Sequence, residues 1–233
     1  MTKKPASKST RWPPAVLANW FDLAPEDEAA FDEWHNFEHV PERLGVPGFT
    51  LARRYTAWPG PGAEGHGKLM LYDATELSVF ASPAYGARLD NPTPWTARVV
   101  PLIRNMTRTA YTLTEVARLG HGSFIQTIRL ARDPDSAEAL GPLVDTLMRH
   151  PMISGVAVGR PDTAVTHYKD ATTEGKSTDG RAESVYPWCV FVEATDDVAF
   201  KDAPGIVRNA LRDDLRDAHG YRATYLMSVS DLP

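Results

Sequence analysis

The chain has 233 residues, of which 42% are apolar and 24% charged, a composition typical of a folded protein rather than a disordered, collagen-like or coiled-coil one. Its 25 basic and 30 acidic residues give a formal net charge of −5, so no overall positive charge exists that would attract nucleic acid. Cys189 is the only cysteine, which excludes an intrachain disulfide and a thiolate metal cluster, and we expect it to be a small buried apolar side chain.

The N-terminal segment is basic and contains no acidic residue. We expect residues 1–12 to form a disordered basic tail, because no apolar segment of a secretory signal follows them. No run approaches the ~20 apolar residues of a membrane helix either. These features predict a cytoplasmic protein without a membrane partner.

The first half of the chain predicts the order β-α-β-β-α-β. An apolar run that ends at Asp22 predicts the first strand, and Pro25 with three following acidic residues is typical of the first turn of a helix, which Pro41 should then disturb. A Gly- and Pro-rich loop, 59–67, separates the next two strands. The predicted strands are 14–22, 49–57, 68–74 and 107–116; the second helix covers 76–90 and resumes over 95–104.

The second half repeats this order, which fits a length suited to two compact domains. Arg108 and Tyr111 in the last strand of the first half align with Arg222 and Tyr225 in the last strand of the second. The polar stretch 169–184 predicts a mobile loop. The predicted strands are 122–131, 155–166, 186–195 and 221–230, and the helices are 136–150 and 197–219.

Each βαββαβ unit predicts a four-stranded antiparallel sheet with two helices on one face, so its other face needs cover. We therefore predict an α+β fold in which two tandem ferredoxin-like units, residues 13–118 and 119–233, pack sheet to sheet. This arrangement is a dimeric α+β barrel formed within one chain.

The passage from the first helix to the second strand carries a recognisable motif. Residues 33–49, EWHNFEHVPERLGVPGF, followed by Ala52-Arg53-Arg54-Tyr55, resemble the W-x-x-x-E-H-[IV]-P-E-R-L-x-x-P-G-F-x-x-A-R-R-Y signature of the EthD-like branch of the dimeric α+β barrel superfamily. The matching stretch of the second half, 145–151, lacks the E-H pair. The resemblance implies a tandem-repeat member with one site, in the first half, that binds small aromatic or polyketide-like molecules without a metal.

The E-H pair, Glu38 and His39, is the predicted catalytic pair. We expect His39 near the C-terminus of the helix, where it could simply cap the last carbonyls while Glu38 faces solvent. The resemblance instead implies a proton-transfer group at the mouth of a cavity between helix and sheet. Histidine suits that role because its ordinary pKa of ~6.5 allows it to give or take a proton at neutral pH.

The same residues also match the H-x-x-E-H pattern of a zinc site. We expect no metal, because such a site needs an uninterrupted helix and Pro41 follows His39 closely. A weaker three-ligand site of His35, His39 and Glu42 is left open.

Arg53 and Arg54 lie on one predicted strand and should point to opposite faces. Arg53 shares its face with Phe49 and Tyr55, so it is the better candidate to anchor an anionic ligand. A structural ion pair between the buried arginine and Glu38 or Glu42 is favoured slightly over ligand binding.

The remaining binding candidates are aromatic or polar residues of the first half. Trp34 is close enough in sequence to His39 to roof the same cavity, and Asn19 is a polar group within an apolar strand that needs a partner. The predicted substrate-binding residues are Arg53, Tyr55, Trp34, Trp20, Asn19, His35 and Tyr72.

We predict a cofactor-independent enzyme that uses histidine acid/base chemistry on a small hydrophobic molecule, aromatic or lactone-like, as a lyase or isomerase. The alternatives are a cofactorless monooxygenase of phenols and a non-catalytic binding protein whose second half is only a lid and scaffold. Some relatives bind haem through a histidine of the second unit, which would make His150, His167 or His219 a ligand; this alternative ranks lower, since His219 precedes Gly220 at a predicted helix end and suits a cap. The expected partner is a small molecule, and a homodimer is left open.

Overall fold

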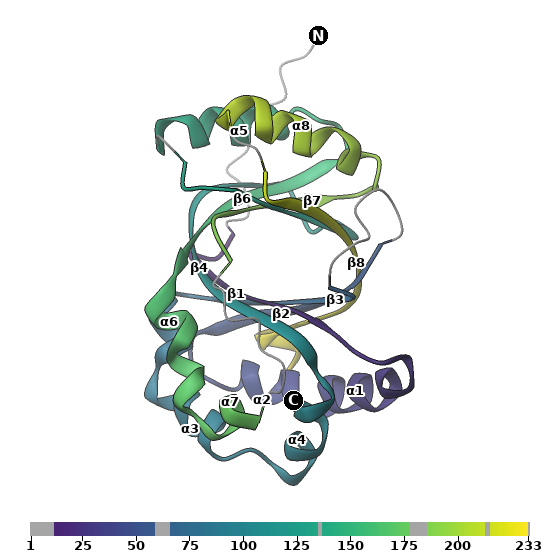
Figure 1. The fold of residues 1–233 in the computed structure, drawn as a ribbon, viewed down its shortest axis with the longest axis vertical. Coiled ribbons are helices and arrows are strands. Elements are labelled where there is room, and N and C mark those ends of the chain that lie inside the picture. Colours follow the sequence, from purple (N-terminus) through teal and green to yellow (C-terminus); the bar gives the residue numbers. More distant parts are fainter. Residues whose placement is uncertain (1–11, 59–65, 135–136, 178–185, 213–214, 233) are drawn as a thin grey trace.

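The computed structural model describes residues 12–58, 66–134, 137–177, 186–212 and 215–232. Eight antiparallel strands form one closed barrel in the order β1-β3-β2-β8-β5-β7-β6-β4 (Figure 1). The strands are β1 (Ala15–Asp22), β2 (Phe49–Ala57), β3 (Lys68–Ala74), β4 (Arg104–Arg118), β5 (Phe124–Arg129), β6 (Ile153–Asp162), β7 (Cys189–Ala194) and β8 (Asp217–Ser228). Each half of the chain places its four strands in the same spatial order, β4-β1-β3-β2 and β8-β5-β7-β6.

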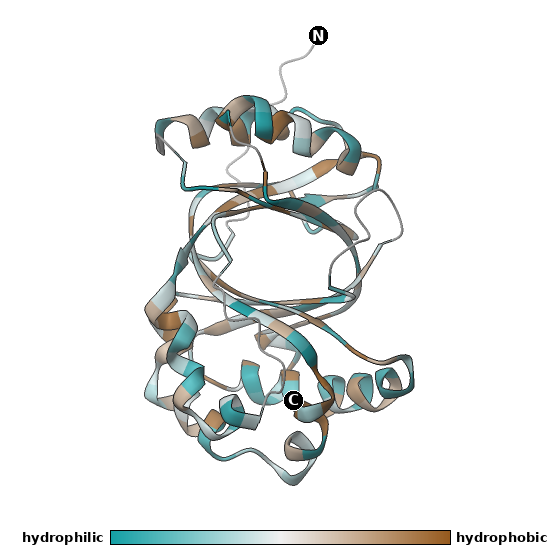
Figure 2. Cartoon of the chain, in the orientation of Figure 1, coloured by the Kyte–Doolittle hydropathy of each residue, from teal (hydrophilic) through white to brown (hydrophobic). Residues whose placement is uncertain are grey.

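Helices cover two opposite sides of the barrel (Figure 1). One side carries α5 (Leu140–Leu147) and α8 (Ala199–Leu211). The other side carries α1 (Glu28–Trp34), α2 (Val40–Leu44), α3 (Pro83–Asp90), α4 (Pro94–Val99), α6 (Thr163–His167) and α7 (Thr173–Ser177). Figure 2 shows hydrophobic and hydrophilic residues side by side on these helices, as expected where one face of a helix packs on a sheet.

The apolar side chains form three cores, one under each helical layer and one inside the barrel. Along β1, Leu17 and Phe21 pack under the helices of the first half, whereas Val16 and Trp20 point into the barrel. Because both faces of β1 are buried, the strand reads as a continuous apolar run rather than an alternating one. Asn19 shares the helix-facing side with Leu17.

The first helix continues further than expected. The sequence predicts its end near His39, but α1 leads through a π-turn, His35–His39, directly into α2, which ends at Leu44. The backbone N–H of Val40 bonds the carbonyl of His35, five residues earlier. Pro41 has no N–H to give to the carbonyl four residues before it, so it disturbs the helix as predicted but does not end it.

The prediction of a mobile loop over 169–184 is wrong for the residues that the structure describes. Residues 163–177 form α6, a 3₁₀ turn (Tyr168–Ala171) and α7, while residues 178–185 lie outside the described residues. These short helices pack on the first half so closely that any side chain at Gly86 would collide with the hydroxyl of Tyr168. The second half therefore contributes residues to the helical layer of the first.

Two further differences from the prediction concern a candidate haem ligand and the N-terminal tail. The helix predicted over 197–219 ends at Leu211, where Arg212 adopts a left-handed conformation (φ 50°), so His219 lies within β8 and not at a helix end. Of the predicted tail, residues 1–11 lie outside the described residues, but Trp12 is 3% exposed and packs against the guanidinium groups of Arg53 and Arg118.

No helix among the described residues is long and apolar enough to cross a bilayer.

Candidate functional site

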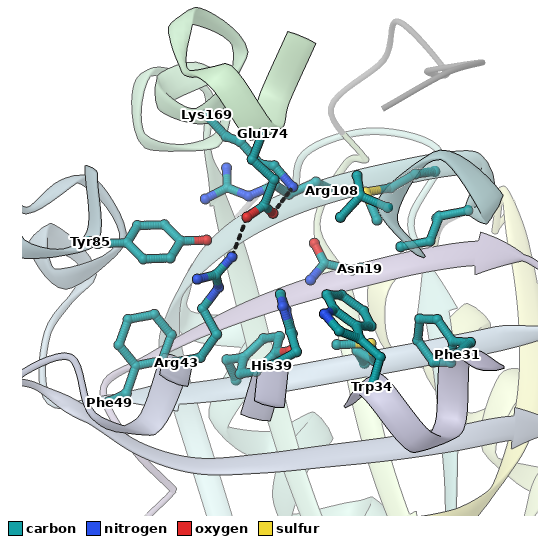
Figure 3. Close-up of a pocket in the computed structure, with 15 residues that line it drawn as sticks. Asn19, Phe31, Trp34, His39, Arg43, Phe49, Tyr85, Arg108, Lys169 and Glu174 are labelled. Carbon is teal, nitrogen blue, oxygen red and sulfur yellow. Dashed lines mark hydrogen bonds and ion pairs between the residues drawn. The ribbon is translucent and has the colours of Figure 1, made fainter. Parts of the chain in front are cut away.

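A small pocket lies between the helices of the first half and the outer face of β1, β3 and β4 (Figure 3). Its walls are apolar and aromatic, with Phe31, Phe49, Met70 and Ile103 beside Trp34 and Tyr72. The space that water can occupy is about 30 Å³, which is room for about two water molecules at ~10–15 Å³ each. Six polar side chains reach it: Asn19, His39, Arg43, Arg108, Lys169 and Glu174.

His39 reaches the pocket from the end of the π-turn. Its ring lies against Trp34, with ring centres 4.3 Å apart, and is only 7% exposed. Burial, and then the nearby positive charge of Arg43, hold the pKa of His39 well below its ordinary value, so the imidazole is neutral at neutral pH. The Nδ1 atom of His39 is buried and has no hydrogen-bond partner among the described residues.

An ion-pair cluster closes one end of the pocket. The carboxylate of Glu174, on α7, accepts hydrogen bonds from the guanidinium of Arg43, on α2, and from Lys169 Nζ at 2.8 Å (Figure 3). Burial alone would raise the pKa of Glu174, but Lys169 and Arg43 together bring it well below its ordinary value, so the carboxylate stays ionised. Because Lys169 and Glu174 belong to the second half of the chain, both halves build this pocket.

Arg108 and Asn19 face the pocket from neighbouring strands, β4 and β1, where they are directly opposite each other in the register. Arg108 Nη1 donates to the backbone carbonyls of Val165, at 3.2 Å, and Thr166. Its Nε and Nη2 atoms, and Asn19 Oδ1, are buried with no partner among the described residues. With Arg43 and Lys169 also present against the single carboxylate of Glu174, the lining of the pocket is positively charged.

His35 supports the pocket from behind. Arg54 Nη1 lies 3.0 Å from His35 Nδ1, and because a guanidinium only donates, that nitrogen carries no proton. The proton of the neutral ring is therefore on Nε2, which lies 3.5 Å from the hydroxyl of Tyr72. Burial, then the charge of Arg54, hold the pKa of His35 well below its ordinary value, and burial raises that of Tyr72.

The predicted catalytic pair is divided by the structure. His39 lines the pocket, but the carboxylate of Glu38 turns away and accepts hydrogen bonds from Thr93 (2.5 Å), Thr96 (3.0 Å) and Trp34 Nε1 (3.2 Å). Glu38 thus joins the π-turn to the start of α4. The position of His39 within a continuous helix also contradicts the capping role that was the alternative for this residue.

Three predicted binding residues lie on the other side of the sheet. Trp20 and Tyr55 belong to the core inside the barrel, and Arg53 is buried there between Asp73 and Glu193, at 2.5 Å from each, instead of pairing with Glu38 or Glu42. A bulge between Phe49 and Leu51 changes the register of β2, so Phe49 lines the pocket although Tyr55 points into the barrel. Of the other binding candidates, Asn19, Trp34 and Tyr72 line the pocket, and His35 lies directly behind it.

Several pocket residues are not predicted by the sequence. Arg43 lies within the motif at residues 33–55, and Arg108 is one of the residues that align in the internal repeat. The sequence therefore draws attention to both arginines but does not indicate that they line the pocket. Lys169 and Glu174 lie in the predicted loop. Tyr85, whose ring packs against Arg43, has no sequence signal.

No protein-family model matches the sequence, and no curated protein does. Among solved structures, the chain is similar to an anthrone oxidase-like protein (13% identity, 94% of both chains covered, TM-score 0.58). It is also similar to a candidate monooxygenase from Fusobacterium nucleatum subsp. nucleatum (12% identity, 94% of this chain and 96% of that one, TM-score 0.58). A haem-binding protein from Thermus thermophilus matches over 91% of each chain at 12% identity, with a TM-score of 0.50. These similarities show the dimeric α+β barrel fold and not an activity.

The second half does not fit a haem. The space between α5, α8 and their strands is filled by packed aliphatic side chains, including Leu143 and Val207. The histidines considered as ligands lie beside carboxylates: His150 is 3.6 Å from Asp202, His167 bonds Asp170 at 2.8 Å, and His219 is 3.7 Å from Asp217.

The structure also does not bring His35, His39 and Glu42 together as three ligands of one metal ion. Nδ1 of His35 is occupied by Arg54, and the rings of His35 and His39 stack with centres 5.7 Å apart. Across the described ranges, no three His, Cys, Asp or Glu side chains come close enough to hold one metal ion.

Proposed function

We propose that this protein is a cofactor-independent enzyme in which His39 removes a proton from a small, largely apolar molecule. One observation carries the proposal: a neutral buried imidazole, with an unpartnered nitrogen, lines a pocket whose other charged groups are mostly cations. A neutral imidazole is the form that accepts a proton. Nearby guanidinium groups stabilise the negative charge that the substrate then acquires.

The chemistry balances without a further reagent. A C–H or O–H bond of the substrate breaks, its proton moves to His39, and the electron pair stays on the substrate as an enolate or phenolate. His39 then returns the proton to another atom of the substrate, which completes an isomerisation. In a lyase reaction the electron pair instead expels a leaving group, which takes the proton from His39 as it departs. The carboxylate of Glu174 favours the imidazolium formed in between.

The narrow space admits only the reacting end of an aromatic or lactone-like molecule. Binding of the remainder requires movement of the lining side chains or of α7, which is held over the pocket by the ion pairs of Glu174. Such closure around a bound substrate would exclude water from the reacting groups.

We also propose that the chain is a tandem member of the EthD-like branch, made of two ferredoxin-like units. The common spatial order of the strands in the two halves supports the duplication. The motif at residues 33–55 supports the branch, since its His39 and Arg43 both line the pocket.

A second candidate is a cofactorless monooxygenase. The resemblance to an anthrone oxidase-like protein and to a candidate monooxygenase favours it at the level of fold. Its first step is the same proton transfer to His39, after which the substrate anion gives electrons to dioxygen. Consumption of oxygen during turnover separates this outcome from the lyase or isomerase.

The test is turnover by wild type, His39→Gln and the matched control His150→Gln, on a panel of phenols, lactones and aromatic acids with an oxygen electrode. Loss of a general base lowers kcat by about 10²–10⁴-fold. We expect that loss in His39→Gln only, with an unchanged melting temperature. Full kcat in His39→Gln would contradict the proposal, and saturable binding without turnover by wild type would indicate a binding protein.

A further inference from the structure

We infer that the pocket selects substrates that carry a carboxylate with a neighbouring hydroxyl or other hydrogen-bond donor, held by Arg108 and Asn19. The inference rests on the proposed function, because it takes this pocket as the substrate site. It is carried by the hydrogen-bonding groups that the protein itself leaves without partners.

Arg108 lines the pocket, and the protein satisfies only one nitrogen of its guanidinium. Nη1 is fixed by the carbonyls of Val165 and Thr166, which determine the orientation of the group. The two nitrogens left over are Nε and Nη2, both buried. A buried donor without an acceptor destabilises the protein, so this edge is suited to meet a ligand or ordered water.

The pair of unpartnered atoms defines the chemistry of the ligand. The N–H bonds of Nε and Nη2 run parallel on the same side of the guanidinium and match the two oxygens of a carboxylate. A phenolate has one oxygen and would leave one donor unpaired.

Asn19 adds a second requirement. It faces Arg108 directly across the β1–β4 pair, where side chains on one face stand about 4.5–5.5 Å apart. Its Oδ1 atom is buried without a donor. A hydroxyl one or two atoms from the carboxylate would donate to Oδ1 while the carboxylate occupies Arg108.

The charge of the pocket agrees with an anionic substrate. No carboxylate among the described residues pairs with Arg108, whereas Arg43 and Lys169 share that of Glu174 and Arg43 also lies 3.3 Å from that of Glu42. One added carboxylate would balance Arg108 without displacing Glu174.

The experiment is calorimetric titration with phenylacetate, mandelate and 2-phenylethanol at constant ionic strength. Mandelate differs from phenylacetate only by its hydroxyl, and 2-phenylethanol lacks the carboxylate. We expect mandelate to bind most tightly and 2-phenylethanol least. Arg108→Lys keeps the charge but loses the paired donors, so it should weaken both acids about 10-fold or more, since hydrogen bonds to charged groups contribute ~1.5–3 kcal/mol.

Asn19→Ala should remove the preference for mandelate over phenylacetate and leave phenylacetate binding within about 2-fold. The exposed Arg98→Lys is the matched control and should bind like wild type. Melting temperatures verify that each variant is folded.

The titrations are repeated in His39→Gln, so that binding is measured without turnover. We expect His39→Gln to bind both acids and the double variant His39→Gln/Arg108→Lys to lose this binding. That result supports the inference whichever reaction the protein catalyses. Equal binding of the acids and the alcohol, equal binding by wild type and Arg108→Lys, or no binding of either acid would each overturn it. The proposed function would survive those results if neutral substrates still turned over through His39.

Discussion

Arg43 and Glu174 form a buried ion pair although 131 positions separate them in the chain. Arg43 comes from the helix that carries His39, and Glu174 from a five-residue helix in the other half. The pair therefore connects the two halves at the edge of the candidate site, and it sets the charges that surround His39.

Breaking this pair should destabilise the protein strongly. Glu174→Gln removes the buried carboxylate that Arg43 and Lys169 share, so Arg43 keeps only Glu42, 3.3 Å away, as a charged partner. The loss of one member of a buried pair costs about 3–5 kcal/mol. Chemical denaturation should show a loss of this size, against almost none for the exposed control Glu33→Gln. The double variant Arg43→Met/Glu174→Met should lose less than the sum of its single variants, whereas strict additivity would show that the two side chains do not interact.

The proposed activity should persist into mildly acid solution. Burial and Arg43 lower the pKa of His39, so the imidazole remains a neutral base below pH 6.5. A profile of kcat/KM against pH reports this group in the free enzyme, and its acid midpoint should lie below 6.5. Arg43→Met should move that midpoint upward, and a wild-type midpoint at or above 6.5 would contradict the assignment of His39 as a buried base.

Stability should also depend on pH in the range where histidines titrate. The pKa values of His35 and His39 are lower in the folded protein than in the unfolded chain, so below about pH 6.5 the unfolded state binds more protons. The free energy of unfolding should fall as the pH decreases from 6.5, by at most ~1.4 kcal/mol per pH unit for each histidine.

His39→Gln removes the contribution of one histidine to this pH dependence. The free energy of unfolding, measured by urea titration at several pH values, should therefore fall less steeply with decreasing pH in His39→Gln than in wild type. A separate loss is expected below about pH 4.5, where protonation begins to remove the contributions of Glu174 and Glu193. Burial would raise the pKa of Glu193, but His121, Arg53 and Arg118 hold it at about 2. Identical slopes in wild type and His39→Gln between pH 6.5 and 5 would argue against a buried neutral His39.

Arg53→Met should act on stability and not on substrate binding. The substitution leaves Asp73 without its cation inside the barrel and removes one of the two arginines that pair with Glu193. We expect a loss of about 3–5 kcal/mol in the free energy of unfolding. KM measured on the folded fraction should stay unchanged; a large increase in KM with little loss of stability would restore Arg53 as the ligand anchor.

Much of the fold follows from the pattern of apolar residues. The strands are predictable because their apolar runs are bounded by turn residues, and the segments predicted as β2 and β3 match the observed bounds. The same reasoning does not predict the helices of residues 163–177. Their helices are only four or five residues long and rich in threonine, and Glu174 is buried through an ion pair with a distant residue that no local pattern reveals.

The candidate site is predictable only in part. The motif locates His39, and the polar Asn19 within an apolar strand indicates that it needs a partner. Strand alternation places Arg53 correctly beside Tyr55 but cannot show that the bulge near Leu51 moves Phe49 to the other side of the sheet. The pairing of Asn19 with Arg108 depends on the register of two strands about 90 residues apart, which a single sequence does not contain.

The π-turn at His35–His39 also determines which side chains of the helix face the pocket. Such a turn corresponds to one residue inserted into a regular α-helix. Deleting a single residue there would restore the regular helix and rotate everything after it by about 100°. His39 and Arg43, which lie four residues apart and so on one face of the helix, would then rotate together away from the pocket while His35 stayed in place. The extra residue in this turn is therefore what directs both side chains into the pocket.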